Sequence, residues 1–422
     1  MKLMVIGGGG REHAIVKKLK ENPEVTDLYV LPGNAGMAAD AVCVPIKALD
    51  IPGIVRFAVE KKIDYAVVTP DDPLAAGAVD ALEAAGIACF GPNQRAAVIE
   101  SSKIFAKDLM KRYSIPTAKY ETFDSLEAAL TYLETAPIPT VIKADGLALG
   151  KGVVIAETRA EAKAAVTDMM ANGRFGKSGE RIVIEEFLTG PEISVLSFTD
   201  GHTVVPMVSS MDHKRAGEGD TGLNTGGMGT VAPNPCYTPA VAQTCMETIF
   251  LPTIRAMRAE GRPFKGCLYF GLMLTADGPK VIEYNCRFGD PETQVVLPLL
   301  KTDLLTVMRA VTEERLSEIE VEFASQYAAC VVIASEGYPS AYKKGFPIKV
   351  PEDVLPHVYF AGAADKEGQL VTSGGRVLGV TAVADSLEAA LREAYEMAGR
   401  ISFEGAWYRR DIGARALAWK EN

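Results

Sequence analysis

The chain has 422 residues, of which 48% are hydrophobic and 23% are charged, and its formal net charge at pH 7 is −10. This length exceeds what one ordinary hydrophobic core can organise, so the sequence predicts about two to four domains. The acidic balance and the lack of a long basic run argue against nucleic acid or an anionic membrane as the main partner. They leave room for an anionic small substrate in a local basic pocket.

Seven cysteines lie scattered between Cys43 and Cys330 without any C-x-x-C pair. Such an odd, unclustered set is typical of reduced thiols in a cytosolic protein. No apolar run approaches the roughly 20 residues that cross a bilayer. The N-terminal MKLMVIGGGG is broken too early by glycines to be a signal peptide. We therefore predict a cytoplasmic protein that binds no membrane and no nucleic acid, and we expect a monomer.

Strands and helices alternate through the first hundred residues. Hydrophobic patterning predicts strands at 1–7, 27–31, 64–70 and 87–92. Between them it predicts helices at 11–21, 51–62 and 73–86. This alternation indicates a parallel, doubly wound sheet whose ligands lie at the carboxyl ends of its strands. Glycine- or proline-rich turns follow at that edge at 7–10, 32–36 and 69–73.

Beyond residue 100 the pattern changes. A helix at 101–113 leads to predicted strands at 140–145, 152–157 and 181–188, with a helix at 159–171. A strand after 193 runs into the glycine-rich loop MDHKRAGEGDTGLNTGGMG at 211–229. The remaining predicted helices are 238–261, 303–315 and 386–401, and the remaining strands are 267–274, 279–285, 328–335, 357–364 and 375–384.

Two glycine motifs suggest phosphate binding. GGGGREH fits a dinucleotide fingerprint badly, because the third glycine of that pattern falls on Glu12 or His13 and the second strand ends without an acidic residue. It fits a general anion cradle at a helix N-terminus. The alternative is that the glycines serve only a tight turn, with Arg11 and His13 facing solvent.

KADGLALGKG resembles a Walker loop but is one residue short between Gly146 and Gly150, and Gly152 follows Lys151 where Ser or Thr is needed. Predicted strands on both sides favour a mobile glycine flap that covers phosphate. Lys143 lies in the middle of an apolar strand, where an ammonium group is costly unless it meets an anion. The alternative is that Lys143 reaches the surface along its aliphatic stem.

Two acidic strands complete the pattern. IVIEEFLTGPE at 182–192 is typical of a hinge that offers backbone groups to an adenine edge while Glu192 reaches a ribose, although an ordinary strand end would look similar. In VIEYNCRFGDPETQ, strand alternation predicts Val281, Glu283 and Asn285 on one face and Ile282, Tyr284 and Cys286 on the other. The alternative is a half-exposed strand running into a turn.

Lys103, Lys143, a glycine flap, EEFL and a late E-x-N strand follow one another as in ATP-grasp enzymes. From residue 1 to about 420 the chain resembles the phosphoribosylamine–glycine ligase family, through GGGGREHA, PGNAG, KADGLALGKGV, NTGGMG, EYNCRFGDPETQ and YRRDIGARAL. This resemblance implies an α/β and α+β multidomain fold. Its parts are an N-terminal doubly wound sheet (1–100), a two-lobed ATP-grasp domain (101–320) with a mobile lid (120–190), and a small C-terminal α+β domain (321–422).

The resemblance also implies a reaction. Glycine and 5-phosphoribosylamine would be joined with ATP, through glycyl phosphate, to give glycinamide ribonucleotide, ADP and phosphate in the second step of purine synthesis. Mg²⁺ or Mn²⁺ would be needed. The chain departs from the family at Thr69–Asp72, where Gly-Pro-Glu is expected, and at Leu223, where Pro is expected. It also has Tyr269-Phe270-Gly271 where many ATP-grasp relatives carry another metal carboxylate, which would leave more of a Mg²⁺ shell to water and phosphate.

Residue by residue, the resemblance implies metal ligands at Glu283 and Asn285. It implies catalytic roles for Arg287, Asp212 and Lys214. The implied ATP-binding residues are Lys103, Lys143, Gly150, Lys151, Gly152, Glu185, Glu186, Phe187, Leu188 and Glu192. The implied substrate-binding residues are Gly9, Gly10, Asn34, Asn224, Thr225, Gly226, Gly227 and Asp290.

Three alternatives remain open from the sequence. A nicotinamide-dependent oxidoreductase would explain the N-terminal sheet but would leave the E-x-N strand and both lysines without a role. A non-catalytic ATP sensor would need the nucleotide groove but not NTGGMG or Arg287. Another ATP-grasp carboxylate–amine ligase would use the same groove with different substrates.

Overall fold

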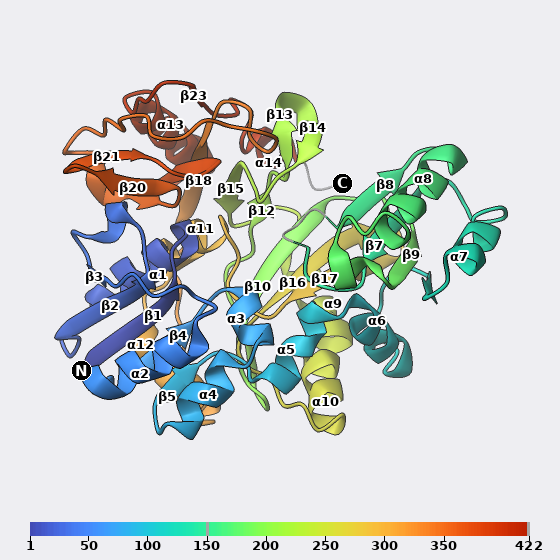
Figure 1. The fold of residues 1–422 in the computed structure, drawn as a ribbon, viewed down its shortest axis with the longest axis horizontal. Helices are drawn as coiled ribbons and strands as arrows, with labels where there is room; N and C mark the ends of the chain where they lie inside the picture. The colour runs from blue at the N-terminus through green and yellow to red at the C-terminus, as the bar shows by residue number, and fades with distance from the viewer. Residues whose placement is uncertain (149–151, 420–422) are drawn as a thin grey trace.

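The computed structural model describes residues 1–148 and 152–419. Figure 1 shows a central sheet (β10, β16, β17) with the N-terminal sheet in blue at lower left, the C-terminal sheet in orange at upper left and a smaller lobe in green at right. In the described part of the chain, no helix is both long and apolar enough to pass through a membrane. The predicted multidomain α/β and α+β architecture is confirmed.

The N-terminal sheet is parallel throughout, with the strand order β3-β2-β1-β4-β5. Its strands are β1 (Lys2–Gly7), β2 (Asp27–Pro32), β3 (Val42–Cys43), β4 (Tyr65–Val68) and β5 (Ala88–Phe90). Its helices are α1 (Gly10–Lys20), α2 (Ile51–Lys61), α3 (Asp71–Ala75), α4 (Ala78–Ala84) and α5 (Gln94–Ser101). The single helix predicted at 73–86 is wrong: Gly77 has φ of +86°, which no α-helix contains, and it separates α3 from α4.

The central sheet is antiparallel, with the order β11-β10-β16-β17. Its strands are β10 (Glu192–Asp200), β11 (Val204–Pro206), β16 (Lys265–Thr275) and β17 (Gly278–Asn285). The helices of this region are α6 (Lys103–Arg112), α9 (Pro239–Cys245), α10 (Leu251–Ala259), α11 (Thr293–Val296) and α12 (Leu304–Thr312). A π-helical turn at Met246–Phe250 joins α9 to α10, just before Pro252, which has no N–H to donate to the preceding turn.

The green lobe is a separate antiparallel sheet of order β6-β9-β7-β8, which we call the lid. Its strands are β6 (Tyr120–Phe123), β7 (Thr140–Ala144), β8 (Val153–Ala156) and β9 (Ile182–Glu186). The helices α7 (Leu126–Tyr132) and α8 (Arg159–Met170) contribute to its own small hydrophobic core. The lid therefore has packing that is largely independent of the rest of the molecule.

The C-terminal sheet has the order β12-β15-β18-β22-β19, with β23 paired to β18. Its strands are β12 (Met211–Asp212), β15 (Gly229–Ala232), β18 (Tyr327–Ser335), β19 (Val358–Phe360), β22 (Arg376–Ala384) and β23 (Ala406–Trp407). Two hairpins, β13 (Arg215–Gly217) with β14 (Thr221–Asn224) and β20 (Ala363–Lys366) with β21 (Gln369–Thr372), stand apart from it, and its helices are α13 (Leu387–Ala398) and α14 (Ala414–Ala418). The region predicted as one glycine-rich loop thus holds short strands, two of which join this sheet.

The strand that carries Glu283 contains a β-bulge. In the pairing of β16 with β17, Gly271 lies opposite Glu283 and Leu272 lies opposite Val281, so Ile282 is an extra residue. An extra residue reverses the alternation of side chains beyond it. The prediction that Val281 shares a face with Glu283 is therefore wrong.

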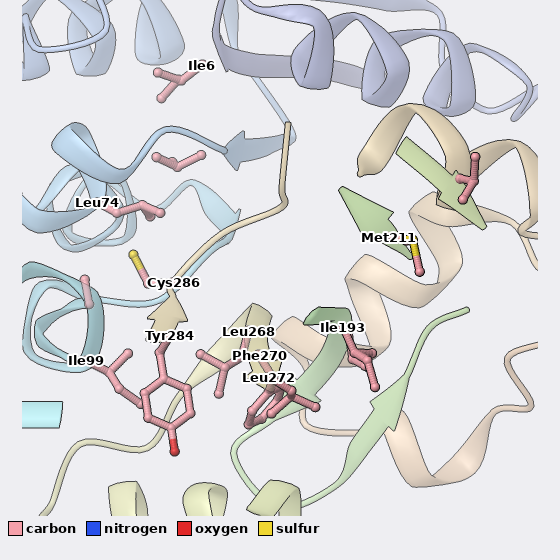
Figure 2. Packing of buried hydrophobic residues seen from close by; sticks show 14 of the residues in the cluster. Ile6, Leu74, Ile99, Ile193, Met211, Leu268, Phe270, Leu272, Tyr284 and Cys286 are labelled. Carbon is pink, nitrogen blue, oxygen red and sulfur yellow. The ribbon is translucent and has the colours of Figure 1, made fainter. Parts of the chain in front are cut away.

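Figure 2 shows the core face of the same strand, where Tyr284 and Cys286 project among buried hydrophobic side chains. Val281 is fully buried and belongs to this cluster. Other members labelled in the figure are Ile193, Leu268, Phe270 and Leu272. The core thus gains Val281 and Tyr284 from β17 and Cys286 from the residue after it, and the opposite face is left to polar residues.

Helix α1 is covered by the C-terminal sheet, so the interpretation of Arg11 and His13 as solvent-facing is wrong. His13 is 1% exposed. Its Nδ1 accepts a hydrogen bond of 2.8 Å from the N–H of Phe360, and its Nε2 lies 3.0 Å from Asp40 Oδ2. Arg11 donates to the carbonyl of Phe288. Burial lowers the pKa of His13, which suits a neutral ring joining the first and last sheets.

Candidate active site

A cleft of about 610 Å³ lies between the lid and the central sheet. It brings together most of the predicted site residues, namely Lys103, Lys143, Gly152, Glu185, Glu186, Phe187, Leu188, Glu192, Asp212, Lys214, Asn224, Thr225, Gly226, Glu283, Asn285, Arg287 and Asp290. Gly9, Gly10, Asn34 and Gly227 are not on its lining. Gly150 and Lys151 of the predicted flap lie outside the described residues.

Lys143 projects from β7 of the lid and does not reach the surface. Its side chain is 4% exposed, and its Nζ lies 3.1 Å from Glu185 Oε1. It also donates a hydrogen bond of 2.9 Å to the carbonyl of Ile282, the bulge residue of β17. Lys143 thus joins the lid to the strand of Glu283.

Lys107 is a charged cleft residue that the sequence reasoning missed. It is 2% exposed, and its Nζ lies 3.0 Å from Glu185 Oε2 and 2.8 Å from Thr117 Oγ1. Burial lowers the pKa of Lys107 to about 8, against the raising effect of Glu185. The signal was available, because Lys107 is four residues from Lys103 on α6, and residues at this spacing share a helix face.

Lys103 begins α6 at the hinge between the lid and the central region. Its Nζ donates a hydrogen bond of 3.2 Å to the carbonyl of Gly146. Asp145 accepts from the Ile104 N–H at 2.8 Å and pairs with Arg181 at 2.6 Å. Burial lowers the pKa of Lys103, and Glu283 is the foremost charge that opposes this change. These contacts tie the start of α6 to the end of β7.

Glu283 and Asn285 lie on the polar face of β17 and line the same cleft as Lys103 and Lys143. Burial would raise the pKa of Glu283, but Lys214, Lys143 and Lys103 lower it below its ordinary value. Glu283 is thus held as a carboxylate. Among the described residues, no group of three or more His, Cys, Asp or Glu could hold a metal ion. A cation here would have a carboxylate and a carboxamide oxygen, the hard donors that Mg²⁺ accepts, and would take further ligands from phosphate or water.

Arg287 follows this strand and lies among acceptors. Its Nη2 donates to Asn285 Oδ1 at 3.2 Å and lies 3.5 Å from Glu100 Oε1. Its Nε is buried and has no hydrogen-bond partner among the described residues. The guanidinium group is thus fixed at the end of β17, beside Asn285.

Lys214 and Thr225 shape the glycine-rich loop at the end of the cleft. Lys214 Nζ lies 3.2 Å from Glu192 and 3.7 Å from Glu283. Glu192 is the foremost cause of a strongly raised pKa for Lys214, so this side chain stays charged. Thr225 donates from its backbone N–H and from its hydroxyl to the carbonyl of Lys214. These bonds fix the loop around its lysine.

The C-terminal segment holds the same loop, through residues of the YRRDIGARAL motif. Arg409 is 2% exposed and donates to Asp220 Oδ1 at 3.0 Å and to the carbonyl of Arg215 at 2.9 Å. Asp411 accepts from the N–H of Gly219. Arg415 pairs with Asp220 and lines the cleft. We call Arg409, Asp411 and Arg415 the C-terminal clamp.

Replacing Arg409 by Met should reduce both stability and turnover. The change removes the donor to Asp220 and to the carbonyl of Arg215, and each lost hydrogen bond costs about 0.5–1.5 kcal/mol. It also frees the loop that carries Lys214, so turnover should fall more than nucleotide affinity does. Urea unfolding and steady-state kinetics measure the two effects. Arg410→Met is the matched control, because Arg410 is exposed and its backbone N–H keeps its bond to Glu218; an equal loss in both variants would contradict a role for the clamp.

The glycines at the start of α1 abut the cleft at Asp290. The Arg11 N–H donates to Asp290 Oδ2 at 3.4 Å, and a Cβ added at Gly10 would lie 2.6 Å from Gln294 Nε2. The side-chain amide of Asn34 donates to the carbonyls of Gly8 and Phe360, and so joins the glycine turn to the C-terminal sheet. The glycines therefore permit a close approach of backbone to this end of the cleft.

Three family models match the chain. The phosphoribosylglycinamide synthetase N domain matches residues 1–100, the ATP-grasp (A) domain matches 101–293 and the C domain matches 328–415. A phosphoribosylamine–glycine ligase from Caldanaerobacter subterraneus is 48% identical over 98% of this chain and 100% of its own length. One from Vibrio vulnificus is 47% identical over 99% of both.

Solved structures agree with these matches. A phosphoribosylamine–glycine ligase from Thermotoga maritima superposes with a TM-score of 0.86 at 34% identity, over 98% of this chain and 100% of that one. A biotin carboxylase from Campylobacter jejuni, solved as a β-γ-ATP complex, has a TM-score of 0.73 at 15% identity over 98% of both chains. The second likeness shows the fold alone.

Proposed function

The chain belongs to the phosphoribosylamine–glycine ligase family, and we propose which of its residues carry each part of the reaction. The protein is an ATP-dependent enzyme that joins glycine to 5-phosphoribosylamine, giving glycinamide ribonucleotide, ADP and phosphate in de novo purine synthesis. One observation supports the assignment of roles above all others. Lys103 and Lys143 line the same cleft as Glu283, Asn285 and Arg287.

ATP is proposed to lie between the lid and the central sheet. Lys103 and Lys143 bind its phosphates, because they line the cleft beside Glu283 and act on its carboxylate. The segment 185–188 leaves β9 and offers backbone groups to the adenine, and Glu192 at the start of β10 reaches the ribose. The flap that includes Gly150, Lys151 and Gly152 is proposed to cover the phosphates.

A divalent cation, Mg²⁺ or Mn²⁺, is proposed to bind at Glu283 and Asn285. When bound, such an ion neutralises phosphate charge and aligns the terminal phosphoryl group. The protein residues supply the remaining charge. Lys103, Lys143 and Arg287 surround the carboxylate of Glu283 and offset the negative charge of ATP.

Glycine is proposed to be activated as glycyl phosphate. Its carboxylate oxygen attacks the γ-phosphorus of ATP, and the bond to the β-phosphate oxygen breaks to release ADP. The amine of phosphoribosylamine then attacks the glycyl carbonyl carbon, phosphate leaves, and the nitrogen loses a proton. Arg287 is proposed to lie beside the reacting carboxylate and to offset its charge. Positioning and charge neutralisation provide most of the rate gain.

The substrates are proposed to meet near the glycine-rich loop. Asp212 and Lys214 lie at the glycine and ribosylamine ends, beside the loop residues Asn224, Thr225, Gly226 and Gly227. Gly9 and Gly10 at the start of α1 face the ribose phosphate together with Asn34 and Asp290. The approach of these glycines to Asp290 supports this arrangement.

An oxygen-labelling experiment tests the mechanism. Glycine labelled with ¹⁸O in its carboxylate should transfer one labelled oxygen to each phosphate released, because that oxygen becomes the bridge in glycyl phosphate. An adenylate route would place the label in AMP and would release pyrophosphate. Mass spectrometry of the products distinguishes the two. Unlabelled phosphate would overturn the proposed intermediate.

We also infer a cytoplasmic monomer. All seven cysteines are unpaired thiols, as expected in a reducing compartment. Light scattering of the purified protein tests the oligomeric state.

A further inference from the structure

Glu185 is a buried carboxylate that two lysines share. It is 4% exposed. Lys107 Nζ lies 3.0 Å from its Oε2, and Lys143 Nζ lies 3.1 Å from its Oε1. Both lysine side chains are buried, and all three residues line the cleft. Two cations thus surround one anion, and the roles proposed above use Lys143 but leave Lys107 without one.

The two lysines hold Glu185 in different ways. Lys107 projects from α6, outside the lid, and donates a hydrogen bond of 2.8 Å to the hydroxyl of Thr117. That hydroxyl donates in turn to the carbonyl of Val281 on β17 at 2.7 Å. Lys143 belongs to the lid, and the Oε1 atom that it approaches is buried yet accepts no hydrogen bond from any described residue. Lys107 is therefore the anchored partner of Glu185, whereas Lys143 contacts it by charge alone.

This arrangement matters when a nucleotide enters the cleft. In the proposed function Lys143 binds phosphate, and its ammonium group must then turn from Glu185 to the ligand. A buried carboxylate that loses its only cation is costly. Because Lys107 stays beside Glu185, the carboxylate keeps a partner and the charge of Lys143 becomes available to the nucleotide.

We propose that Lys107 is a positioning residue for ATP, which acts as the lasting counter-ion of Glu185 and so releases Lys143 to the phosphates. This inference rests on the proposed function, in which Lys143 binds phosphate. Without a positive charge on residue 107, Glu185 and Lys143 form a closed pair that the nucleotide has to break. A direct contact between Lys107 and the nucleotide, or a purely structural role, predicts different behaviour in the variants below.

The charge of Lys107 also predicts a pH dependence. Burial lowers its pKa to about 8, while Glu185 opposes this change and Lys143 adds to it. The other groups that face it are Glu186 on β9 and the ring of Tyr120 on β6. When Lys143 turns to ATP, the pKa of Lys107 rises, so the occupied enzyme binds more protons than the empty one. Nucleotide affinity should therefore be full below about pH 8 and should fall as the pH rises above it.

Calorimetry of the full-length enzyme with a non-hydrolysable ATP analogue tests the proposal. At pH 7, Lys107→Met should weaken binding of the analogue by at least about tenfold. Adding Glu185→Gln to this variant should restore most of the affinity, because the group that captures Lys143 is then neutral. Lys111→Met is the matched control, since it removes an exposed lysine from the same helix, and it should match the wild type.

Kinetics and pH give two further readouts. In Lys107→Met the KM for ATP should rise while kcat at saturating ATP stays close to that of the wild type, because the reacting groups are unchanged. The affinity of the wild type for the analogue should fall by up to about tenfold per pH unit above pH 8. This fall should be smaller in Lys107→Met. Urea unfolding shows whether each variant is folded.

The outcomes separate the proposal from its alternatives. If Glu185→Gln fails to restore binding in Lys107→Met, Lys107 contacts the nucleotide itself or serves only the fold, and the proposal is overturned. Unchanged binding in Lys107→Met, or a wild-type affinity that stays constant above pH 8, would overturn it as well. Normal binding of the analogue by Lys143→Met would instead overturn the phosphate contact in the proposed function.

Discussion

Replacing Glu283 by Gln should lower turnover by at least about 100-fold, because even residues that only orient metal ligands are worth about 10- to 100-fold. The substitution keeps the shape of the side chain but removes the charge that would face both the metal and Lys143, Lys103 and Lys214. The fold should survive, since the core contacts of this segment are made by Val281 and Tyr284 of β17 and by Cys286 just after it, on the other face. Initial rates across a series of Mg²⁺ concentrations measure the loss.

The control for this variant is Asp277→Asn. Asp277 lies in the turn between β16 and β17, and its side chain is 83% exposed, so the change removes one charge from the same hairpin outside the cleft. It should leave turnover unchanged. Near-normal activity of Glu283→Gln at low Mg²⁺ would show that this residue is not a metal ligand.

Replacing Lys143 by Met should lower turnover roughly 100- to 1,000-fold, the range found when one preorganised donor to a reacting group is lost. It should also destabilise the lid by about 1–3 kcal/mol, because Glu185 loses one of its two buried partners. Activity and stability therefore fall together in this variant, whereas Glu283→Gln loses activity alone. The rate of ADP formation measures the loss of turnover, and urea unfolding measures the loss of stability.

Lys163→Met on α8 is the corresponding control. Lys163 belongs to the same lid, but its side chain is 38% exposed and its partner Glu134 is at the surface. The variant should keep both stability and turnover. If Lys143→Met retained normal ATP use, the proposed phosphate contact of this lysine would be wrong.

The elements of the fold could be predicted where one sequence segment determines its own structure. Four strands of the N-terminal sheet are apolar runs between turn residues, and they occur close to their predicted positions. The two-residue edge strand β3 was not predicted. Helix α5 was missed, although Asn93 caps it with a side-chain bond to the N–H of Ala96 and so offered a local signal. Gly77 was also a local signal that was overlooked, because a glycine within the helix predicted at 73–86 indicates a possible break.

Features that depend on a second segment could not be predicted. The bulge at Ile282 is a property of the pairing between β16 and β17, so alternation within one strand placed Val281 on the wrong face. His13 is buried because β19 packs on α1. The residue of β19 that bonds to it, Phe360, lies 347 residues later in the chain. In each case the deciding contact is made by residues that no local pattern connects.

The C-terminal clamp has a consequence for the folding of the enzyme during its synthesis. Arg409 pairs with Asp220, 189 residues earlier in the chain. The loop that bears Lys214 can therefore be fixed only after almost the whole chain has been synthesised. A nascent chain still on the ribosome, or one cut short by a premature stop before residue 409, should bind nucleotide with its lid and yet lack an anchored substrate loop. Unfinished copies would then consume no glycine. Completeness of synthesis thereby becomes a condition for activity.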